Sequence, residues 1–185
     1  MTKKELRAEI RSRLSGLSDC YKKESSKKIS ELALSCDEYK SAKSIFVYIS
    51  TVNEPDTGDI INDALQTGKT VYVPKCIEKG VMVPVLINED TEFSDGYMGI
   101  REPLYYDENI SLAEIDLCVI PCMSVSVKGE RLGHGAGFYD IFLSKTKTCK
   151  LCLCFSELLC DDIPTDEYDI KMDCVITENG IYFTE

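Results

Sequence analysis

The chain has 185 residues, a formal net charge of −11 at pH 7 and a pI near 4.7. This length predicts a single domain, residues 1–185, that can bury a sizeable core. The negative charge argues against nucleic acid and against an anionic membrane surface as partners, because both would repel most of the surface. The sequence contains no long apolar run and begins with an amphipathic segment rather than a signal peptide, so we expect a cytoplasmic protein. Nothing in it demands more than a monomer.

The first part of the chain predicts a pair of helices. In residues 3–17 apolar side chains recur with helical spacing, at Leu6, Ile10, Leu14 and Leu17. Ser18 is placed to cap a second helix over about residues 19–35. Lys3 and Arg7 lie one turn apart on the first helix. Such a pair is usually solvated charge, but in so acidic a chain it would also supply part of a cationic cluster for an anion.

A strand, a helix and a second strand follow. Residues 44–50 predict a strand, Thr57 is placed to N-cap a helix that closes at Gly68, and residues 70–74 predict a strand parallel to the first. Folds of this kind bind ligands in the loops at the carboxyl ends of their strands. Glu54 lies in such a loop. It is either an exposed loop acid or a carboxylate that accepts hydrogen bonds from a donor-rich heterocycle.

The remaining strands complete a sheet. Residues 81–87 predict an antiparallel hairpin partner with Pro84 at an edge, and residues 116–121 form a short apolar run typical of a buried strand. Residues 150–155 and 174–177 predict the closing strands. The alternation of strands and helices predicts an α/β fold, a three-layer α/β/α sandwich with a mainly parallel central sheet.

The chain has ten cysteines and one histidine, His134. Cys149, Cys152 and Cys154 contain a C-x-x-C spacing. A zinc site would need a second ligand pair, whereas buried thiols on a strand behave as small apolar side chains. We therefore expect a strand rather than a metal–thiolate site.

A glycine-rich stretch, residues 131–140, is the strongest functional signal. Gly133, Gly135 and Gly137 precede a segment with helical spacing, and such a loop presents free backbone N–H groups to a phosphate. Arg131 offers a planar fork of donors. Asp140 is either a first-turn acid stabilised by the helix dipole or a ligand of a magnesium ion beside the phosphate.

Several motifs in this order resemble the 5-formyltetrahydrofolate cyclo-ligase family, also called 5,10-methenyltetrahydrofolate synthetase. The resemblance covers nearly the whole chain. Its motifs are residues 3–7, 54–57, 71–74, 99–103, 116–140 and 169–173.

The resemblance implies closure of 5-formyltetrahydrofolate to 5,10-methenyltetrahydrofolate, with ATP as co-substrate and Mg²⁺ as cofactor. The γ-phosphoryl group moves to the formyl oxygen, N10 attacks the resulting iminium phosphate, and phosphate leaves. The protein's task is then to position the reactants and to neutralise charge.

The resemblance also assigns residues. Glu54 matches the folate-binding acid, Asp140 and Asp169 match the magnesium ligands, and Arg131 is the candidate catalytic residue. The positions that match the ATP contacts are Lys3, Arg7, Arg131, Leu132, Gly133, His134, Gly135, Ala136, Gly137, Phe138 and Tyr139, and those from His134 to Phe138 also match folate contacts.

Two positions depart from the family pattern. Many members have aspartate at the position of Ser126 and often lysine at that of Ala136. Without that lysine, Arg131, Arg7, Lys3 and the metal would have to compensate more of the phosphate charge. Other readings stay open. These are a non-catalytic nucleotide or anion sensor, and a sugar-phosphate isomerase or CoA-transferase on a related fold.

Overall fold

The computed structural model describes residues 1–78, 80–96, 99–106 and 112–184. The helices are α1 Lys3–Ser15, α2 Asp19–Ser35, α3 Asp37–Ser41, α4 Gly58–Gln66 and α5 Phe138–Leu143, with 3₁₀ helices η2 Leu112–Glu114 and η3 Ser156–Leu158. The strands are β1 Ser44–Val47, β2 Thr70–Glu78, β3 Val81–Ile87, β4 Phe93–Asp95, β5 Arg101–Pro103, β6 Leu117–Ile120, β7 Ser124–Val125, β8 Arg131–Leu132, β9 Cys149–Leu153, β10 Cys174–Thr177 and β11 Gly180–Phe183.

A seven-stranded sheet in the order β11-β10-β9-β6-β1-β2-β3 forms the centre of the fold. The inner pairs are parallel, and only the edge strands β3 and β11 run antiparallel to their neighbours. The predicted mainly parallel sheet is therefore confirmed. Because β1 and β6 lie side by side at its centre, the loops that follow them open at the same edge of the sheet.

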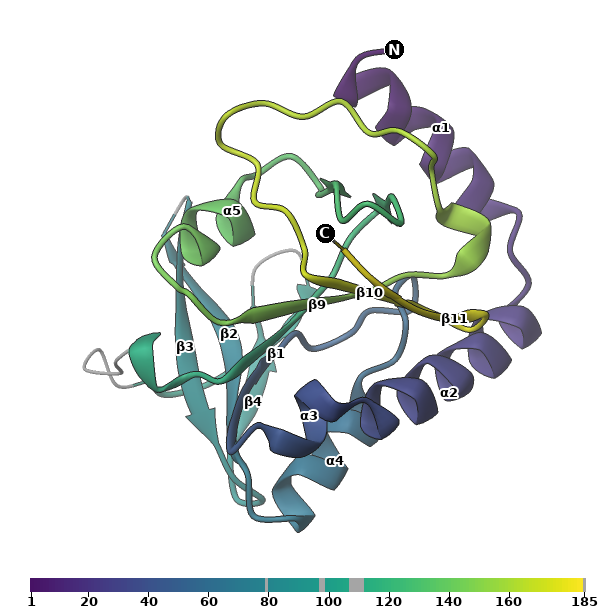
Figure 1. Ribbon diagram of the computed structural model, residues 1–185. Coiled ribbons are helices and arrows are strands. Elements are labelled where there is room, and N and C mark those ends of the chain that lie inside the picture. The colour runs from purple at the N-terminus through teal and green to yellow at the C-terminus, as the bar shows by residue number, and fades with distance from the viewer. Residues whose placement is uncertain (79, 97–98, 107–111, 185) are drawn as a thin grey trace.

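Helices cover both faces of this sheet (Figure 1). In that view α2, α3 and α4 lie below the sheet, whereas α1 and α5 lie above it. The two N-terminal helices thus lie on opposite faces, and the three-layer α/β/α arrangement is confirmed. Phe46 of β1 stacks on Phe142 of α5, with ring centroids 4.5 Å apart, and this contact fixes α5 on the upper face.

The N-terminal helices begin where the sequence predicts. Thr2 and Glu5 form a capping box on α1, and the Ser18 side chain accepts a hydrogen bond from the Tyr21 N–H on α2. The first helix ends at Ser15 instead of residue 17, because Gly16 forms its C-cap. Every apolar side chain of its predicted stripe is buried or partly buried against the core.

The predicted cap at Thr57 is wrong in its chemistry. Thr57 occupies the N-cap position of α4, but its hydroxyl donates to the Tyr48 carbonyl oxygen at 2.7 Å. An Asp56 carboxylate oxygen accepts from the Gly58 N–H instead. The strand β1 ends at Val47 rather than at residue 50. Beyond Val47, the Tyr48 carbonyl oxygen and the Ser50 N–H bond to the Thr57 hydroxyl instead of to a neighbouring strand.

The edge of the sheet near β3 follows the prediction, with Pro84 on an outer strand. Lys79, in the predicted turn between β2 and β3, lies outside the described residues. The sequence did not predict β11, the β7–β8 hairpin or the small β4–β5 sheet. Each of these strands has two to four residues, too few for a clear alternating pattern.

Six of the ten cysteines are buried in the core, and Cys20 is exposed. All ten are free thiols, and burial raises the pKa of Cys118 to about 11, so this side chain stays neutral and apolar. Within the described part of the chain, no group of three or more His, Cys, Asp or Glu side chains is arranged to hold a metal ion. No helix among these residues is both long and apolar enough to cross a membrane.

Candidate active site

The glycine loop, residues 133–137, joins β8 to α5. The hairpin of β7 and β8 separates it from β6, so the predicted order of strand, loop and helix holds with one insertion. Gly135 and Gly137 have φ of 102° and 73°, a backbone region that favours glycine. Among the described residues, the N–H groups of residues 134–137 have no hydrogen-bond acceptor. The loop can therefore donate several hydrogen bonds to an anion.

Arg131 lies beneath this loop, with 4% of its side chain exposed. One terminal nitrogen donates to the Pro121 carbonyl oxygen at 3.3 Å, and the other pairs with Asp140 at 2.9 Å. Its buried Nε has no acceptor within the described part of the chain. A buried donor without an acceptor is costly, so this arrangement leaves one hydrogen bond of Arg131 unmade among the described residues.

Asp140 connects Arg131 to the acidic segment near the C-terminus. One carboxylate oxygen pairs with Arg131, and the other accepts from the Ile170 N–H at 3.3 Å. The neighbour of Ile170 is Asp169, so the two predicted metal ligands are brought to the same place. Asp140 is thus more than a first-turn acid, because it compensates the charge of a buried arginine.

Helix α1 supplies two cations to the same place. Lys3 donates to carboxylate oxygens of Asp166 at 2.7 Å and Asp169 at 2.5 Å, and Arg7 Nε donates to the Gly133 carbonyl oxygen at 2.8 Å. Burial opposes the charge of Lys3, but its two carboxylate partners outweigh burial and raise its pKa. The pair is therefore engaged with the loop and the acidic segment, and is not merely solvated.

Glu54 approaches the glycine loop from the other side. Its Oε1 lies 3.7 Å from His134 Nε2, and its Oε2 accepts from the N–H and the hydroxyl of Thr51, both at 2.9 Å. Burial alone would raise the pKa of Glu54, but the contacts with His134 and Thr51 outweigh it and hold the pKa below its usual range. Only 10% of the side chain is exposed, so Glu54 is not an ordinary exposed loop acid.

The donor set suits magnesium bound together with a phosphate. Asp140 and Asp169 offer hard carboxylate oxygens, and Mg²⁺ in nucleotide sites takes one or two carboxylates plus phosphate oxygens and water. In this structure Arg131 and Lys3 compensate these two acids. Asp166, which shares Lys3 with Asp169, was missed by sequence reasoning. The only signal for it was its place in the acidic stretch before Asp169.

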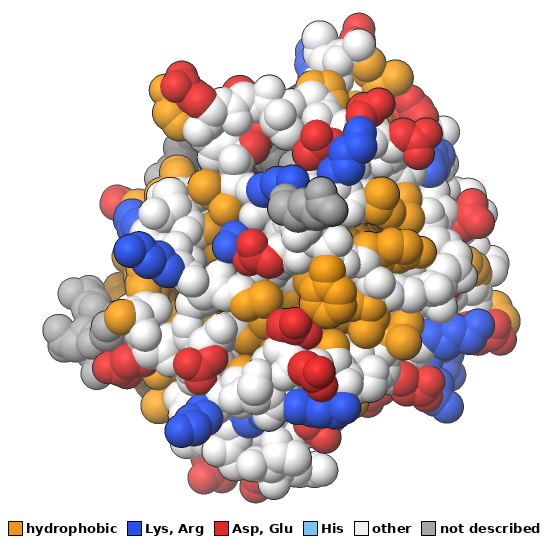
Figure 2. All heavy atoms as spheres, viewed as in Figure 1, with side chains coloured by type: hydrophobic (Ala, Val, Ile, Leu, Met, Phe, Trp, Pro, Cys, Tyr) orange, Lys and Arg blue, Asp and Glu red, His pale blue; other side chains and the backbone are white. Residues whose placement is uncertain are grey.

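The departure at Ser126 has a local structural account. Its buried hydroxyl donates to a carboxylate oxygen of Glu130 and accepts from the N–H of Lys128, so it closes the turn between β7 and β8. Ala136 is exposed at the glycine loop, and a Cβ placed on the neighbouring Gly135 would lie 3.3 Å from the guanidinium carbon of Arg7, so a cation lies beside this position. Figure 2 shows acidic and basic side chains interspersed over the viewed face. The basic side chains on this face do not form a continuous basic surface.

Comparison with known proteins gives one consistent family. The model of the 5-formyltetrahydrofolate cyclo-ligase family matches residues 1–178. The 5-formyltetrahydrofolate cyclo-ligase of Mus musculus is 30% identical, over 96% of this chain and 94% of its own. A probable enzyme of the same name from Schizosaccharomyces pombe is 31% identical, over 98% and 97%. The solved structure of Aquifex aeolicus 5,10-methenyltetrahydrofolate synthetase has a TM-score of 0.86 and 27% identity, and the match covers 99% of this chain and 93% of that one.

Proposed function

This chain belongs to the 5-formyltetrahydrofolate cyclo-ligase family, and we propose that it converts 5-formyltetrahydrofolate to 5,10-methenyltetrahydrofolate with ATP, releasing ADP and phosphate. One observation carries the proposal. Glu54, the candidate folate acid, lies 3.7 Å from His134 of the candidate phosphate loop. A pterin held by Glu54 would therefore place its formyl group beside a phosphate held by the loop.

We assign the phosphate to the free N–H groups of residues 134–137, with Lys3 and Arg7 as the nearby cations. Arg131 holds the loop and Asp140 in place. Its buried Nε has no hydrogen-bond acceptor among the described residues. Held in this way, the γ-phosphorus can accept the formyl oxygen while ADP leaves. The protein contributes position and charge compensation, and it forms no covalent bond to the substrate.

The second half of the reaction needs little from the chain beyond orientation. N10 attacks the carbon of the N5 iminium phosphate, the N10 proton goes to solvent, and phosphate departs to leave the methenyl bridge. Glu54, ionised because its pKa is lowered, would accept hydrogen bonds from the amino and ring N–H donors of the pterin. That contact would keep N10 and the formyl carbon within reach of each other.

We propose that Asp140 and Asp169 hold the magnesium ion that accompanies ATP. When bound, the ion would supply positive charge to the transferring phosphoryl group. In this structure Lys3 and Arg131 compensate the two acids, and their positive charges would also attract the phosphate oxygens of ATP. We also propose that residues 1–185 act as one domain, as a monomer in the cytoplasm. Gel filtration of the purified chain tests the oligomeric state.

The decisive experiment follows the absorbance of the methenyl product. The purified chain is incubated with 5-formyltetrahydrofolate, ATP and Mg²⁺, and ADP release is measured in parallel. We expect one ADP for each methenyl product formed, with no product when ATP is omitted. A nucleotide sensor would instead bind ATP in a titration and form no product, and that outcome would refute the proposal.

A further inference from the structure

The contact between Glu54 and His134 joins the two ligand positions of the proposed function. Oε1 of Glu54 lies 3.7 Å from Nε2 of His134. The other oxygen, Oε2, accepts hydrogen bonds from both the N–H and the hydroxyl of Thr51, each at 2.9 Å. A carboxylate oxygen has two lone pairs, so Thr51 occupies both acceptor positions of Oε2. A ligand with N–H donors therefore has to bond to Oε1, the oxygen that His134 faces.

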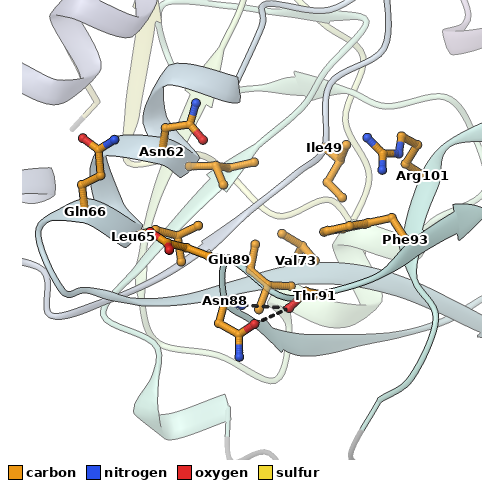
Figure 3. A pocket seen from close by; sticks show the side chains of 12 residues that line it. Ile49, Asn62, Leu65, Gln66, Val73, Asn88, Glu89, Thr91, Phe93 and Arg101 are labelled. Carbon is orange, nitrogen blue, oxygen red and sulfur yellow. Dashed lines mark hydrogen bonds between the residues drawn. The ribbon is translucent and has the colours of Figure 1, made fainter.

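A pocket on the α4 face of the sheet does not reach this carboxylate. The pocket, of about 410 Å³, lies between α4, strands β2 and β3, and the β4–β5 sheet. Ile49 lines it at the base of the Glu54 loop, and Phe93 and Arg101 lie at the same end (Figure 3). Glu54 and His134 are not among the described residues of its lining. A ligand in this pocket alone would leave the contact between Glu54 and His134 in place.

His134 is held loosely enough to exchange its partner. Its side chain is 61% exposed, whereas that of Glu54 is 10% exposed. Their separation exceeds the roughly 2.7–2.9 Å of a charge-assisted hydrogen bond, so the two groups attract each other as an ion pair that another anion can separate. His134 also belongs to the glycine loop, and the N–H groups of residues 134–137 have no acceptor among the described residues. A phosphate on these N–H groups would bring a second anion close to the same imidazole.

His134 is the group whose charge changes near neutral pH. It is the only histidine of the chain, and a histidine gains a positive charge as the pH falls from about 8 to 5. The other charged and titratable side chains around the contact are Glu54, Arg7, Arg131, Asp140, Tyr48 and Tyr139. The arginines keep their charge, and burial raises the pKa of both tyrosines, so these stay neutral. Burial would also raise the pKa of Glu54, but its contacts with His134 and Thr51 outweigh burial and hold the pKa low, so Glu54 stays ionised.

We propose that His134 is a positioning residue that couples the two sites: when protonated, it pairs with Glu54 while the glycine loop is empty, and it turns to the phosphate when ATP binds. This exchange frees Oε1 of Glu54 for the pterin. The inference rests on the proposed function, because it places ATP at the loop and the pterin at Glu54. In mild acid, each ligand then promotes binding of the other, and linkage makes this effect equal in both directions. At higher pH the neutral imidazole leaves Glu54 uncovered, and the coupling disappears.

The test measures 5-formyltetrahydrofolate binding by titration calorimetry at about pH 6 and about pH 8. Each titration is run with and without Mg²⁺ and the β,γ-imido analogue of ATP, which binds without transferring its phosphoryl group. His134→Gln removes the titrating group, and His134→Arg makes the positive charge permanent. The terminal phosphate of the nucleotide also titrates in this range, but it does so equally with the parent and with His134→Gln, so their difference isolates His134. Thermal melts verify that each variant is folded.

In the parent, the ATP analogue should tighten folate binding by about twofold to fivefold at the lower pH, the scale of one partly exposed ion pair, and should leave it unchanged at the higher pH. His134→Gln should abolish the tightening at both pH values, and His134→Arg should retain it at both. Tightening that is equal at both pH values in the parent, or that survives in His134→Gln, would overturn the inference. Absence of any coupling in the parent would overturn it as well.

The inference and the proposed function can fail separately. If the parent forms the methenyl product but shows no pH-dependent coupling, only the role of His134 is refuted. If the parent binds both ligands and forms no product with ATP, the proposed function is refuted, and the same titrations still decide whether His134 couples the two sites.

Discussion

Replacing Asp140 with asparagine should lower the stability of the fold and weaken magnesium binding in the same variant. Asp140 lies 2.9 Å from an Arg131 side chain that is only 4% exposed, while Asp140 itself is 22% exposed. If both partners were fully buried, removing one charge would lower the free energy of unfolding by about 3–5 kcal/mol. Asparagine keeps an oxygen that can accept from Arg131, and water reaches Asp140. We therefore expect Asp140→Asn to lower the free energy of unfolding by about 2 kcal/mol.

For a chain of this size, that loss corresponds to a fall in Tm of about 4–8 °C. The matched control is Asp162→Asn, which breaks the Lys128–Asp162 pair, whose side chains are 60% and 83% exposed. Exposed pairs contribute about 0–1 kcal/mol, so its Tm should barely move. Differential scanning fluorimetry measures both variants. Equal shifts for Asp140→Asn and Asp162→Asn would contradict the view that Asp140 compensates a buried charge.

The catalytic half of this prediction is measured separately, as turnover against magnesium concentration. Asp140→Asn and Asp169→Asn should both need more Mg²⁺ for half-maximal rate. In the double variant, the loss of apparent magnesium affinity should be smaller than the sum of the two single losses, since both acids would bind one ion. Asp169→Asn should lose less stability than Asp140→Asn, because its partner Lys3 is 24% exposed and can be solvated. Magnesium curves that superimpose on the parent's would remove both residues from the metal site.

Three further predictions follow from contacts around the site. Glu54→Gln should raise KM for folate and leave KM for ATP nearly unchanged. Since the folded pKa of Glu54 is lowered, its contribution to stability is present at neutral pH and disappears as the pH falls through that lowered pKa. The Tm values of parent and variant should therefore differ at pH 7 and converge in acid. A difference in Tm that stays the same at every pH would contradict this. Lys3→Met should raise KM for ATP several-fold. The control Lys4→Met, at the next and exposed position, should leave KM for ATP unchanged. Equal KM values for the two variants would exclude Lys3 from the nucleotide site. Gly129→Ala should lower the free energy of unfolding, measured by urea titration, by more than Gly68→Ala does. Both glycines have positive φ, but a Cβ at Gly129 would lie 2.3 Å from the Met172 carbonyl oxygen, whereas a Cβ at Gly68 would meet nothing within 4 Å.

The sequence predicted those parts of the fold whose signals are local. The cap at Ser18 and the apolar stripe from Leu6 to Leu17 depend on neighbouring residues, and both are present in the structure. Thr57 shows the limit of such signals. Its hydroxyl has the right position for a cap, but the Tyr48 carbonyl oxygen competes for it, and only the folded loop brings that acceptor close.

The candidate site was predictable as a set of residues, but its connections were not. Nothing in the spacing of Arg131, Asp140 and Lys3 says which acid compensates which cation. The Lys3–Asp169 pair depends on where the segment around Asp169 returns to α1, and a return over so many residues leaves no periodic pattern. The pocket at Arg101 was missed for a similar reason, since α4, the β2–β3 hairpin and the β4–β5 sheet each contribute only part of it.

The pairing of Lys3 with Asp166 also bears on how the protein is made. The two residues are 163 positions apart, so α1 leaves the ribosome long before the segment that pairs with Lys3. Until residues 166–169 emerge, Lys3 lacks its acidic partners, whereas Arg7 and Arg13 of α1 can already bond to the carbonyl oxygens of Gly133 and Leu159. Closure of so long a loop places this contact late in folding. The Lys3 side of the proposed nucleotide site is then assembled only after residues 166–169 have left the ribosome.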